Sequence, residues 1–241
     1  MLDLLKQLSF GPDGWGDEIA RGALLTVELA LATLPFGLAL GLAVALAKDS
    51  SSLVLNALGN GFTTVFRGLP ELLTLFIVYY GGQILLSRLA GLFVEGATVD
   101  VNQFLAGVIA LGLVLGAFSS EVFYAALRSV SRGQKEAAAA LGLPKWTAFR
   151  LVVFPQLWRV ALPGISNNWL VLLKDTSLVS VIAINDLMRQ TSIAVGVTKQ
   201  PFFFYFVACM IYLLFSILSS VVFSRAEARA NRGYSRAGGH A

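Results

Sequence analysis

Five long apolar segments account for most of the chain, and polar stretches separate them. We place these segments at residues 22–47, 58–86, 99–127, 158–183 and 201–224. Each is about long enough to cross a hydrocarbon core of roughly 30 Å. None shows the alternation of a barrel strand, and only helices or closed barrels satisfy all their backbone hydrogen bonds in lipid. The pattern therefore predicts an all-α integral membrane protein with five transmembrane helices.

The fourth apolar segment is the least regular of the five. It contains two helix-disturbing residues and four polar ones, namely Pro163, Gly164, Asn167, Asn168, Lys174 and Asp175. An alternative with four spanning helices, in which residues 158–183 only re-enter the membrane, therefore stays open.

The composition agrees with a membrane protein. Of the 241 residues, 56% are hydrophobic and 13% are charged, and a soluble domain of this size could not bury so much apolar surface. The single cysteine, Cys209, lies in an apolar run, and the single histidine, His240, is the penultimate residue. We therefore expect no disulfide framework and no metal site. The net charge of +4 is explained better by membrane topology than by nucleic-acid binding.

Positive charges predict the orientation. The polar loop before the fourth segment and the stretch after the fifth hold most of them, at Arg128, Arg132, Lys135, Lys145, Arg150, Arg225, Arg229, Arg232 and Arg236. With five spans, both regions and the short loop containing Lys48 share one side, whereas the opposite loops also carry acids such as Glu95, Asp100 and Asp186. Because Lys and Arg concentrate in cytoplasmic loops, we expect a periplasmic N-terminus and a cytoplasmic C-terminus.

This orientation divides the chain into three parts. A periplasmic segment at 1–21 is followed by a transmembrane domain at 22–224 and a basic cytoplasmic tail at 225–241, with a cytoplasmic loop at 129–157 inside the domain. Residues 1–21 lack the basic start of a signal peptide, so we do not expect one there.

Ionisable residues within the predicted spans are functional candidates because charge is costly in a membrane. Arg67 and Glu71 are four residues apart, so on one continuous helix they share a face and could pair with each other. Pro70 lies between them and predicts a local distortion, which makes a hinge or a gate plausible.

A second polar group lies in the fourth segment. Lys174 and Asp175 are adjacent and point in different directions on a helix, so they cannot satisfy each other well. Asn167 shares a face with Lys174, and Asn168 shares one with Asp175. The helix therefore faces protein or water over much of its circumference, and packing inside a dimer is the alternative to a functional role.

The polar loop from Gly133 to Gln156 reads GQKEAAAALGLPKWTAFRLVVFPQ. Its alanine run favours a helix. Gly142 suits the left-handed conformation that ends a helix, and Pro144 is tolerated in the first turn of the next. We therefore predict two short helices at the membrane surface. By composition alone, an ordinary cytoplasmic loop is the alternative.

Three stretches carry a family resemblance. Glu136-Ala137-Ala138 followed by Gly142 resembles the EAA loop of permease subunits in bacterial ATP-binding-cassette (ABC) importers. The flanking Gly-Gln and Phe-Pro-Gln are similar to the version in polar amino acid permeases. FRGLPELLTLFIVYYGG from Phe66 and NNWLVLLKDTSLVSV from Asn167 resemble the same family. The likeness extends over about residues 22–223 and is greatest to the histidine/lysine/arginine/ornithine and octopine/nopaline permeases.

The resemblance implies a type I ABC importer permease in the bacterial inner membrane, working by alternating access. It implies as partners two ATP-binding subunits that hold ATP and Mg, a second permease subunit (a paralogue or a copy), a periplasmic amino-acid-binding protein and membrane lipid. The residues it implies for coupling to the ATPase are Gly133, Lys135, Glu136, Ala137, Ala138, Gly142 and Lys145. The chain has no phosphate-binding loop, no Ser/His/Asp set and no dinucleotide motif, so we expect it to bind no cofactor and not to be an enzyme.

The resemblance also implies a substrate path or gate at polar positions in the membrane, which are Arg67, Pro70, Glu71, Glu121, Asn167, Asn168, Lys174 and Asp175. An acid after the proline is similar to the branch that handles cationic amino acids and opines. We therefore expect Glu71, Glu121 and Asp175 to give the path a negative character suited to a guanidinium or ammonium group.

Two acids in the membrane are harder to interpret. The family usually has an arginine three residues after the position of Glu121, but this chain has Tyr124, so we expect Glu121 to lack a basic neighbour. Glu28 is expected to be packed near an outer interface. The alternative from another class is a channel or ion-coupled carrier without an ATPase, in which the acids would be ion sites.

Overall fold

The computed structural model describes residues 6–11, 14–93 and 98–232, and all regular structure in these ranges is helical. The long helices are α2 (Gly16–Lys48), α3 (Leu53–Gly68), α6 (Gln103–Ser129), α9 (Phe154–Asp175) and α11 (Pro201–Ala230). The shorter ones are α4 (Glu71–Phe76), η1 (Ile77–Gly81), α5 (Gly82–Gly91), α7 (Arg132–Ala140), α8 (Lys145–Ala148), η2 (Phe149–Val153), η3 (Thr176–Ile182) and α10 (Leu187–Thr198). Glu95, Arg236 and His240 lie outside the described residues, as do parts of the predicted segments 1–21 and 225–241.

The α2 and α6 helices form the most extensive contact in the molecule. Glycines on each helix receive side chains of the other: Phe36 and Leu40 of α2 lie over Gly112 and Gly116, and Leu115 of α6 lies over Gly37. A Cβ atom on Gly112 would lie 2.2 Å from the Phe36 ring, so a larger residue does not fit there. Small residues permit this close approach, which is how helices associate in membranes without a hydrophobic driving force. Helix α9 also packs against α6 and touches α2.

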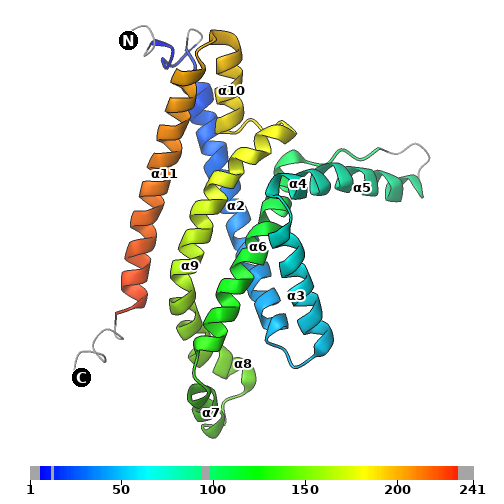
Figure 1. Cartoon of the computed structure of the whole chain (residues 1–241), viewed down its shortest axis with the longest axis vertical. Coiled ribbons are helices and arrows are strands. Elements are labelled where there is room, and N and C mark those ends of the chain that lie inside the picture. The colour runs from blue at the N-terminus through cyan, green and yellow to red at the C-terminus, as the bar shows by residue number, and fades with distance from the viewer. Residues whose placement is uncertain (1–5, 12–13, 94–97, 233–241) are drawn as a thin grey trace.

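The predicted helical segment at residues 58–86 is not a single helix, because the distortion expected at Pro70 is a complete break. Helix α3 ends at Gly68, Leu69 and Pro70 are extended, and α4 begins at Glu71. A residue before proline is pushed out of the helical region by the proline ring, and this explains the break. The α4–η1–α5 stretch then turns aside and projects away from the bundle (Figure 1). It contains a π-helical turn at η1 and few buried residues.

Four helical stretches in the described part of the chain are long and apolar enough to cross a membrane. They are Gly16–Lys48, Glu71–Gly91, Gln103–Ser129 and Pro201–Ala230. Helix α9, the core of the predicted fourth span, is not among them. It ends at Asp175 and continues as the 3-10 helix η3, so the regular α-helix stops before the predicted boundary at residue 183.

The two ends of the bundle differ. The start of α2 and the short helix α10 lie at one end, whereas α7, α8 and the last turns of α11 lie at the other (Figure 1). Helix α11 runs along the edge of the bundle, where it contacts mainly α9 and α10.

A buried acid fixes the start of α10. The carboxylate of Asp186 is fully buried and accepts hydrogen bonds from the backbone N–H groups of Met188 and Arg189, at 3.2 and 3.0 Å. The N–H of Leu187, the first residue of α10, donates to Thr26 Oγ1 of α2 at 3.1 Å. Burial raises the pKa of Asp186 from 3.8 to about 6, although the two N–H donors oppose this rise.

This acid makes the stability of the fold depend on pH. Because the folded pKa is raised, the native state keeps a proton that the unfolded chain releases between pH 3.8 and about 6. We expect the free energy of unfolding, relative to that of Asp186→Asn, to be highest near pH 4. It should fall by up to about 3 kcal/mol as the pH rises through 6.

The measurement is denaturant unfolding in detergent from pH 4 to 8. The exposed Asp49 supplies the control, since Asp49→Asn should show the pH dependence of the wild type. A difference between wild type and Asp186→Asn that does not change with pH would contradict the assignment.

Candidate functional site

The polar segment between α6 and α9 forms two short helices, as predicted. Helix α7 ends in a Schellman motif in which the N–H of Gly142 donates to the Ala139 carbonyl and the N–H of Leu143 donates to the Ala138 carbonyl, at 2.9 and 3.1 Å. Gly142 has φ +71°, so the predicted left-handed conformation is confirmed. Pro144 then precedes α8 directly.

The surface of this segment is polar on α7 and apolar around α8. Ala138 is the buried residue of α7, whereas Glu136 is exposed and has no ion pair among the described residues. Leu141, Trp146 and Leu151 are also exposed. The chain re-enters the bundle through the π-helical turn η2, which runs without a break into α9. The segment thus exposes charged and apolar side chains next to the start of α9, which passes through the bundle.

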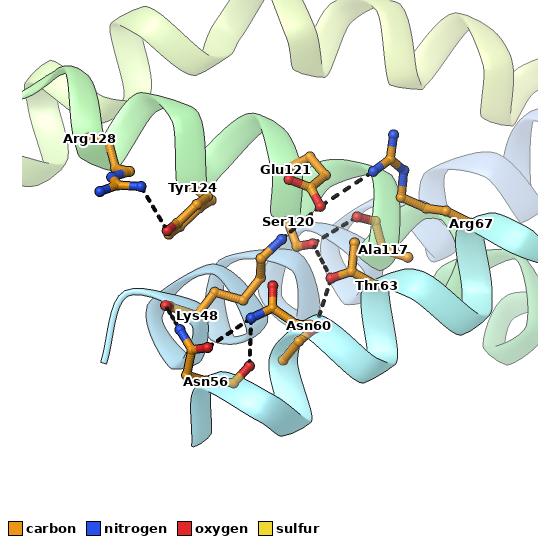
Figure 2. Close-up of polar contacts among 11 residues, drawn as sticks. Lys48, Asn56, Asn60, Thr63, Arg67, Ala117, Ser120, Glu121, Tyr124 and Arg128 are labelled. Carbon is orange, nitrogen blue, oxygen red and sulfur yellow. Dashed lines mark hydrogen bonds and ion pairs between the residues drawn. The ribbon is translucent and has the colours of Figure 1, made fainter. Parts of the chain in front are cut away.

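A charge cluster joins the ends of α2 and α3 to the middle of α6 (Figure 2). One oxygen of Glu121, on α6, accepts a hydrogen bond from Lys48 Nζ at 2.7 Å and lies 3.3 Å from a guanidinium nitrogen of Arg67. Lys48 ends α2 and its side chain is only 4% exposed, whereas the side chain of Arg67, on α3, is 45% exposed. The expectation that Glu121 lacks a basic neighbour was therefore wrong, since two cations from other helices approach it.

Tyr124 also belongs to this cluster. Its hydroxyl accepts a hydrogen bond from Arg128 at 3.2 Å. The ammonium of Lys48 lies 5.0 Å from the centre of its ring, and the Arg128 guanidinium lies 5.4 Å from it. Cations are attracted to an aromatic face at such distances. At the position where the resemblance led us to expect an arginine, this chain thus has a tyrosine whose ring attracts the cations of Lys48 and Arg128.

The predicted pair of Arg67 and Glu71 is not formed. The extended Leu69–Pro70 turn ends the helix between them, so the two residues no longer share a face. Arg67 turns to Glu121, whereas Glu71 follows the break at the start of α4 and has no ion pair in the described part of the chain. The break therefore leaves Arg67 in a cluster with excess positive charge and Glu71 outside it.

Two hollows have Phe118 in common in their linings. One, of about 120 Å³, lies between α6 and α9 and has mostly apolar walls with three polar groups, Asn167, Asn168 and Asp175. The other, of about 370 Å³, is polar and is lined by Arg67 and Glu121 together with Asn60, Thr63 and Thr64. The Arg67 guanidinium also lies 5.4 Å from the centre of the Phe118 ring. A cation can meet an acid in the first hollow, and an anion can meet a guanidinium in the second.

The remaining predicted residues lie outside these hollows. Lys174 is exposed on α9 and lines neither, and Pro70 forms the break before α4. Glu28 is exposed on α2, so the expectation that it is packed was wrong. Within residues 6–11, 14–93 and 98–232, no group of three or more His, Cys, Asp or Glu residues could hold a metal ion.

Comparison with known sequences identifies the family. The family described as "Binding-protein-dependent transport system inner membrane component" matches residues 37–232. The chain belongs to this family. It is therefore an inner-membrane permease component of an ABC transport system and not an enzyme, and the resemblance inferred from the EAA-type loop is confirmed.

Related proteins cover nearly the whole chain. The nopaline transport system permease protein NocQ of Agrobacterium fabrum is 45% identical over 95% of this chain and 98% of its own. The arginine ABC transporter permease protein ArtQ of Escherichia coli K12 is 41% identical over 89% of this chain and 95% of its own. A crystal structure of an amino acid ABC transporter with histidines superposes with a TM-score of 0.75, at 31% identity over 89% of this chain and 95% of that one.

Sequence reasoning missed Lys48 as a site residue of this family member. Lys48 stands next to a polar loop, so its charge was assigned to the loop and to topology. No local signal marks its pairing with Glu121, because 73 residues separate the two. Asn60 and Thr63 were missed because polar residues in a helix of mixed composition are common; Thr63 is buried and lies 3.2 Å from Ser120 on α6.

The cluster predicts a stability effect at Glu121. Replacing Glu121 with Gln leaves the ammonium of Lys48 buried without its anion, and uncompensated buried charges typically cost about 3–5 kcal/mol. We expect Glu121→Gln to lower the free energy of unfolding by about 3 kcal/mol. The double variant Lys48→Met/Glu121→Gln should recover most of this loss.

Denaturant unfolding of both variants in detergent measures the effect. Arg67→Gln is the matched control, and its smaller cost should reflect the greater exposure of Arg67. Equal destabilisation by Glu121→Gln in the presence and absence of Lys48 would contradict the assignment of the pair.

Proposed function

We propose that this chain is one of two permease subunits of an ABC importer for cationic amino acids or opines. Family membership and the names of relatives that transport nopaline and arginine support the substrate class. The observation that carries the proposal is the hollow lined by Asp175, Asn167 and Asn168. An acid beside apolar walls suits an aliphatic chain that carries a positive group.

The solute path is proposed to run past Phe118. The acids Asp175 and Glu71 attract the cationic end of the solute, and Asn167 and Asn168 offer hydrogen bonds in the same hollow. Arg67, which is half exposed in the neighbouring polar hollow, attracts the carboxylate end. We propose that Glu121 holds Arg67 in place. This role replaces the one predicted from the sequence, in which Glu121 attracts the solute. The break at Pro70 lets Arg67 and Glu71 serve opposite ends of one solute.

The topology is proposed to have five spans, with a periplasmic N-terminus and a cytoplasmic C-terminus. Helix α9, the fourth span along the chain, is added to the four long apolar stretches. It packs between α6 and α11, even though its polar residues lower its hydropathy. The arrangement of the ends supports this orientation, because α7, α8 and the end of α11 share the end opposite the start of α2 (Figure 1).

The partners follow from this orientation. The α7–α8 segment, with Glu136 and Trp146 exposed, meets an ATP-binding subunit, one for each permease, and ATP and Mg are bound there. A periplasmic amino-acid-binding protein delivers solute to the end that carries α10. A second permease subunit covers the projecting α4–η1–α5 stretch, whose Ile77, Ile84 and Leu85 are exposed. ATP binding closes the ATPase pair and moves the bundle through the α7–α8 segment, and unequal affinity of the two states for the solute gives direction.

The role of Asp175 in transport can be tested directly. We expect cells without this gene to lose uptake of labelled arginine, and wild-type uptake to be competed by ornithine or octopine but not by glutamine. Asp175→Asn should lower kcat/KM for arginine roughly tenfold or more, because a charge pair in a partly buried site is lost. Asp49→Asn, at an exposed site outside the bundle, is the matched control.

If uptake of arginine does not depend on the gene, the substrate class is wrong. If, in addition, no ATPase co-purifies with the chain, the importer itself is wrong and an ion-coupled carrier or channel takes its place.

Coupling is tested at α7. Glu136 has no partner within the described residues, so Glu136→Ala should leave the stability of the chain unchanged. We expect this variant to lower solute-stimulated ATP hydrolysis and uptake at least tenfold in the assembled transporter. Gln134→Ala, two residues away and on the opposite face of α7, is the control that should retain both. Full turnover in the Glu136→Ala transporter would overturn the coupling role.

A further inference from the structure

An apolar groove opens between α2, α9 and α11, and it shares no lining residue with the polar hollow of the charge cluster. Its volume is about 340 Å³. It is lined by two leucines of α2, a tryptophan of α9 and four residues of α11, namely Leu31, Leu34, Trp169, Leu218, Ser219, Val222 and Phe223. Helix α11 makes most of its contacts with α9 and α10, so a gap remains between it and α2.

The floor of the groove is fixed. The indole N–H of Trp169 donates to Ser219 Oγ at 2.8 Å, and the ring of Phe223 lies 6.4 Å from the tryptophan ring. The two polar groups of the lining, the Trp169 indole N–H and the Ser219 hydroxyl, thus bind each other. The groove offers almost entirely apolar surface, and Leu31, Leu218 and Val222 in its lining are more than half exposed.

The side chains of the lining favour a lipid chain over another helix. Helices that pack closely in membranes meet through small residues. The α2–α6 contact follows this rule, because Gly37, Gly41, Gly112 and Gly116 lie in it. The groove, by contrast, has Ser219 as its one small residue, already bonded to Trp169, and is otherwise lined by leucine, valine, phenylalanine and tryptophan. Such a surface keeps a helix backbone at a distance but accommodates a thin, flexible hydrocarbon.

The groove leads to two arginines on the same face of α11. Leu218, Val222, Arg225 and Arg229 are spaced by four, three and four residues, so they follow one another along a single helix face. At 1.5 Å per residue this row is about 16 Å long, close to half the thickness of a hydrocarbon core. Glu227 points to the opposite side of the helix.

Both arginines are available to an anion. Each is exposed, and neither has an ion pair or a side-chain hydrogen bond in the described part of the chain. They lie in the last turns of α11, where the predicted span at 201–224 has just ended. A guanidinium at this depth meets the phosphate of a lipid headgroup, and its planar donors match phosphate oxygens.

We propose that the groove binds one anionic phospholipid, with an acyl chain between α2 and α11 and its phosphate on Arg225 and Arg229. The lipid fills the space that α11 leaves against α2 and so holds α11 to the bundle. The proposal depends on the proposed orientation only for the leaflet in which the lipid lies, and it is independent of the transported solute.

Quenching of Trp169 by brominated lipids tests the site. The full chain has four tryptophans, and Trp15→Phe, Trp146→Phe and Trp158→Phe together leave only Trp169. This chain is placed in bilayer discs that contain phosphatidylglycerol or phosphatidylcholine with brominated acyl chains, at matched mole fractions. We expect stronger quenching by phosphatidylglycerol. Arg225→Gln/Arg229→Gln should weaken this preference roughly tenfold, because each basic residue near an anionic headgroup contributes to binding.

Two further variants separate the parts of the site. Arg88→Gln removes an exposed arginine of α5 and should leave the preference intact. Val222→Phe fills the groove and should reduce quenching by both lipids. In the purified complete transporter, phosphatidylglycerol retained per copy should fall in the Arg225→Gln/Arg229→Gln variant.

The contrary results are distinct. Equal quenching by both lipids in the unchanged groove would mean that any acyl chain enters and that the arginines select nothing. No quenching by either lipid, or no lipid retained by the complete transporter, would mean that protein covers the groove. Each of these overturns the proposal, whereas uptake of arginine decides the proposed function separately.

Discussion

A charge inside a membrane protein must find an opposite charge, and in this chain the carboxylate of Glu121 satisfies two cations from two other helices. Lys48 is nearly inaccessible to solvent, so its charge depends on Glu121 at 2.7 Å. Arg67 approaches the same oxygen from α3. The ends of α2 and α3 and the middle of α6 are therefore held in register, and the hollow beside Phe118 takes its shape from this arrangement.

The break at Leu69–Pro70 makes this arrangement possible. On a continuous helix, Arg67 and Glu71 would neutralise each other, and neither would be available to other groups. The extended turn sends the cation to α6 and separates it from the acid at the start of α4. The hollow that contains Arg67 and the hollow that contains Asp175 then share Phe118 in their linings. We regard this separation as the physical basis of the proposed preference for a solute that carries both charges.

The parts of the molecule differ in how firmly they are packed. The α2 and α6 helices fit together through glycines, with α9 against them, and form the closely packed centre. The α7–α8 segment, the α4–η1–α5 stretch and α11 each contact this centre over a small area and keep many apolar side chains exposed. This arrangement suits a subunit that works only within a larger assembly. The centre is closely packed, and the outer parts expose apolar surface that partners or lipid can cover.

The sequence by itself determined the helical membrane character, the family and the turn at Gly142. These depend on composition, on local motifs and on the conformational freedom of single residues, all of which are read without knowing what lies nearby in space. Five spans and the orientation remain predictions. Only the tertiary structure decided the partners of the charged residues, since Lys48 and Glu121 are 73 residues apart. Helical spacing suggested Arg67 with Glu71, but the backbone at Pro70 removed that neighbour, and packing of distant helices selected another.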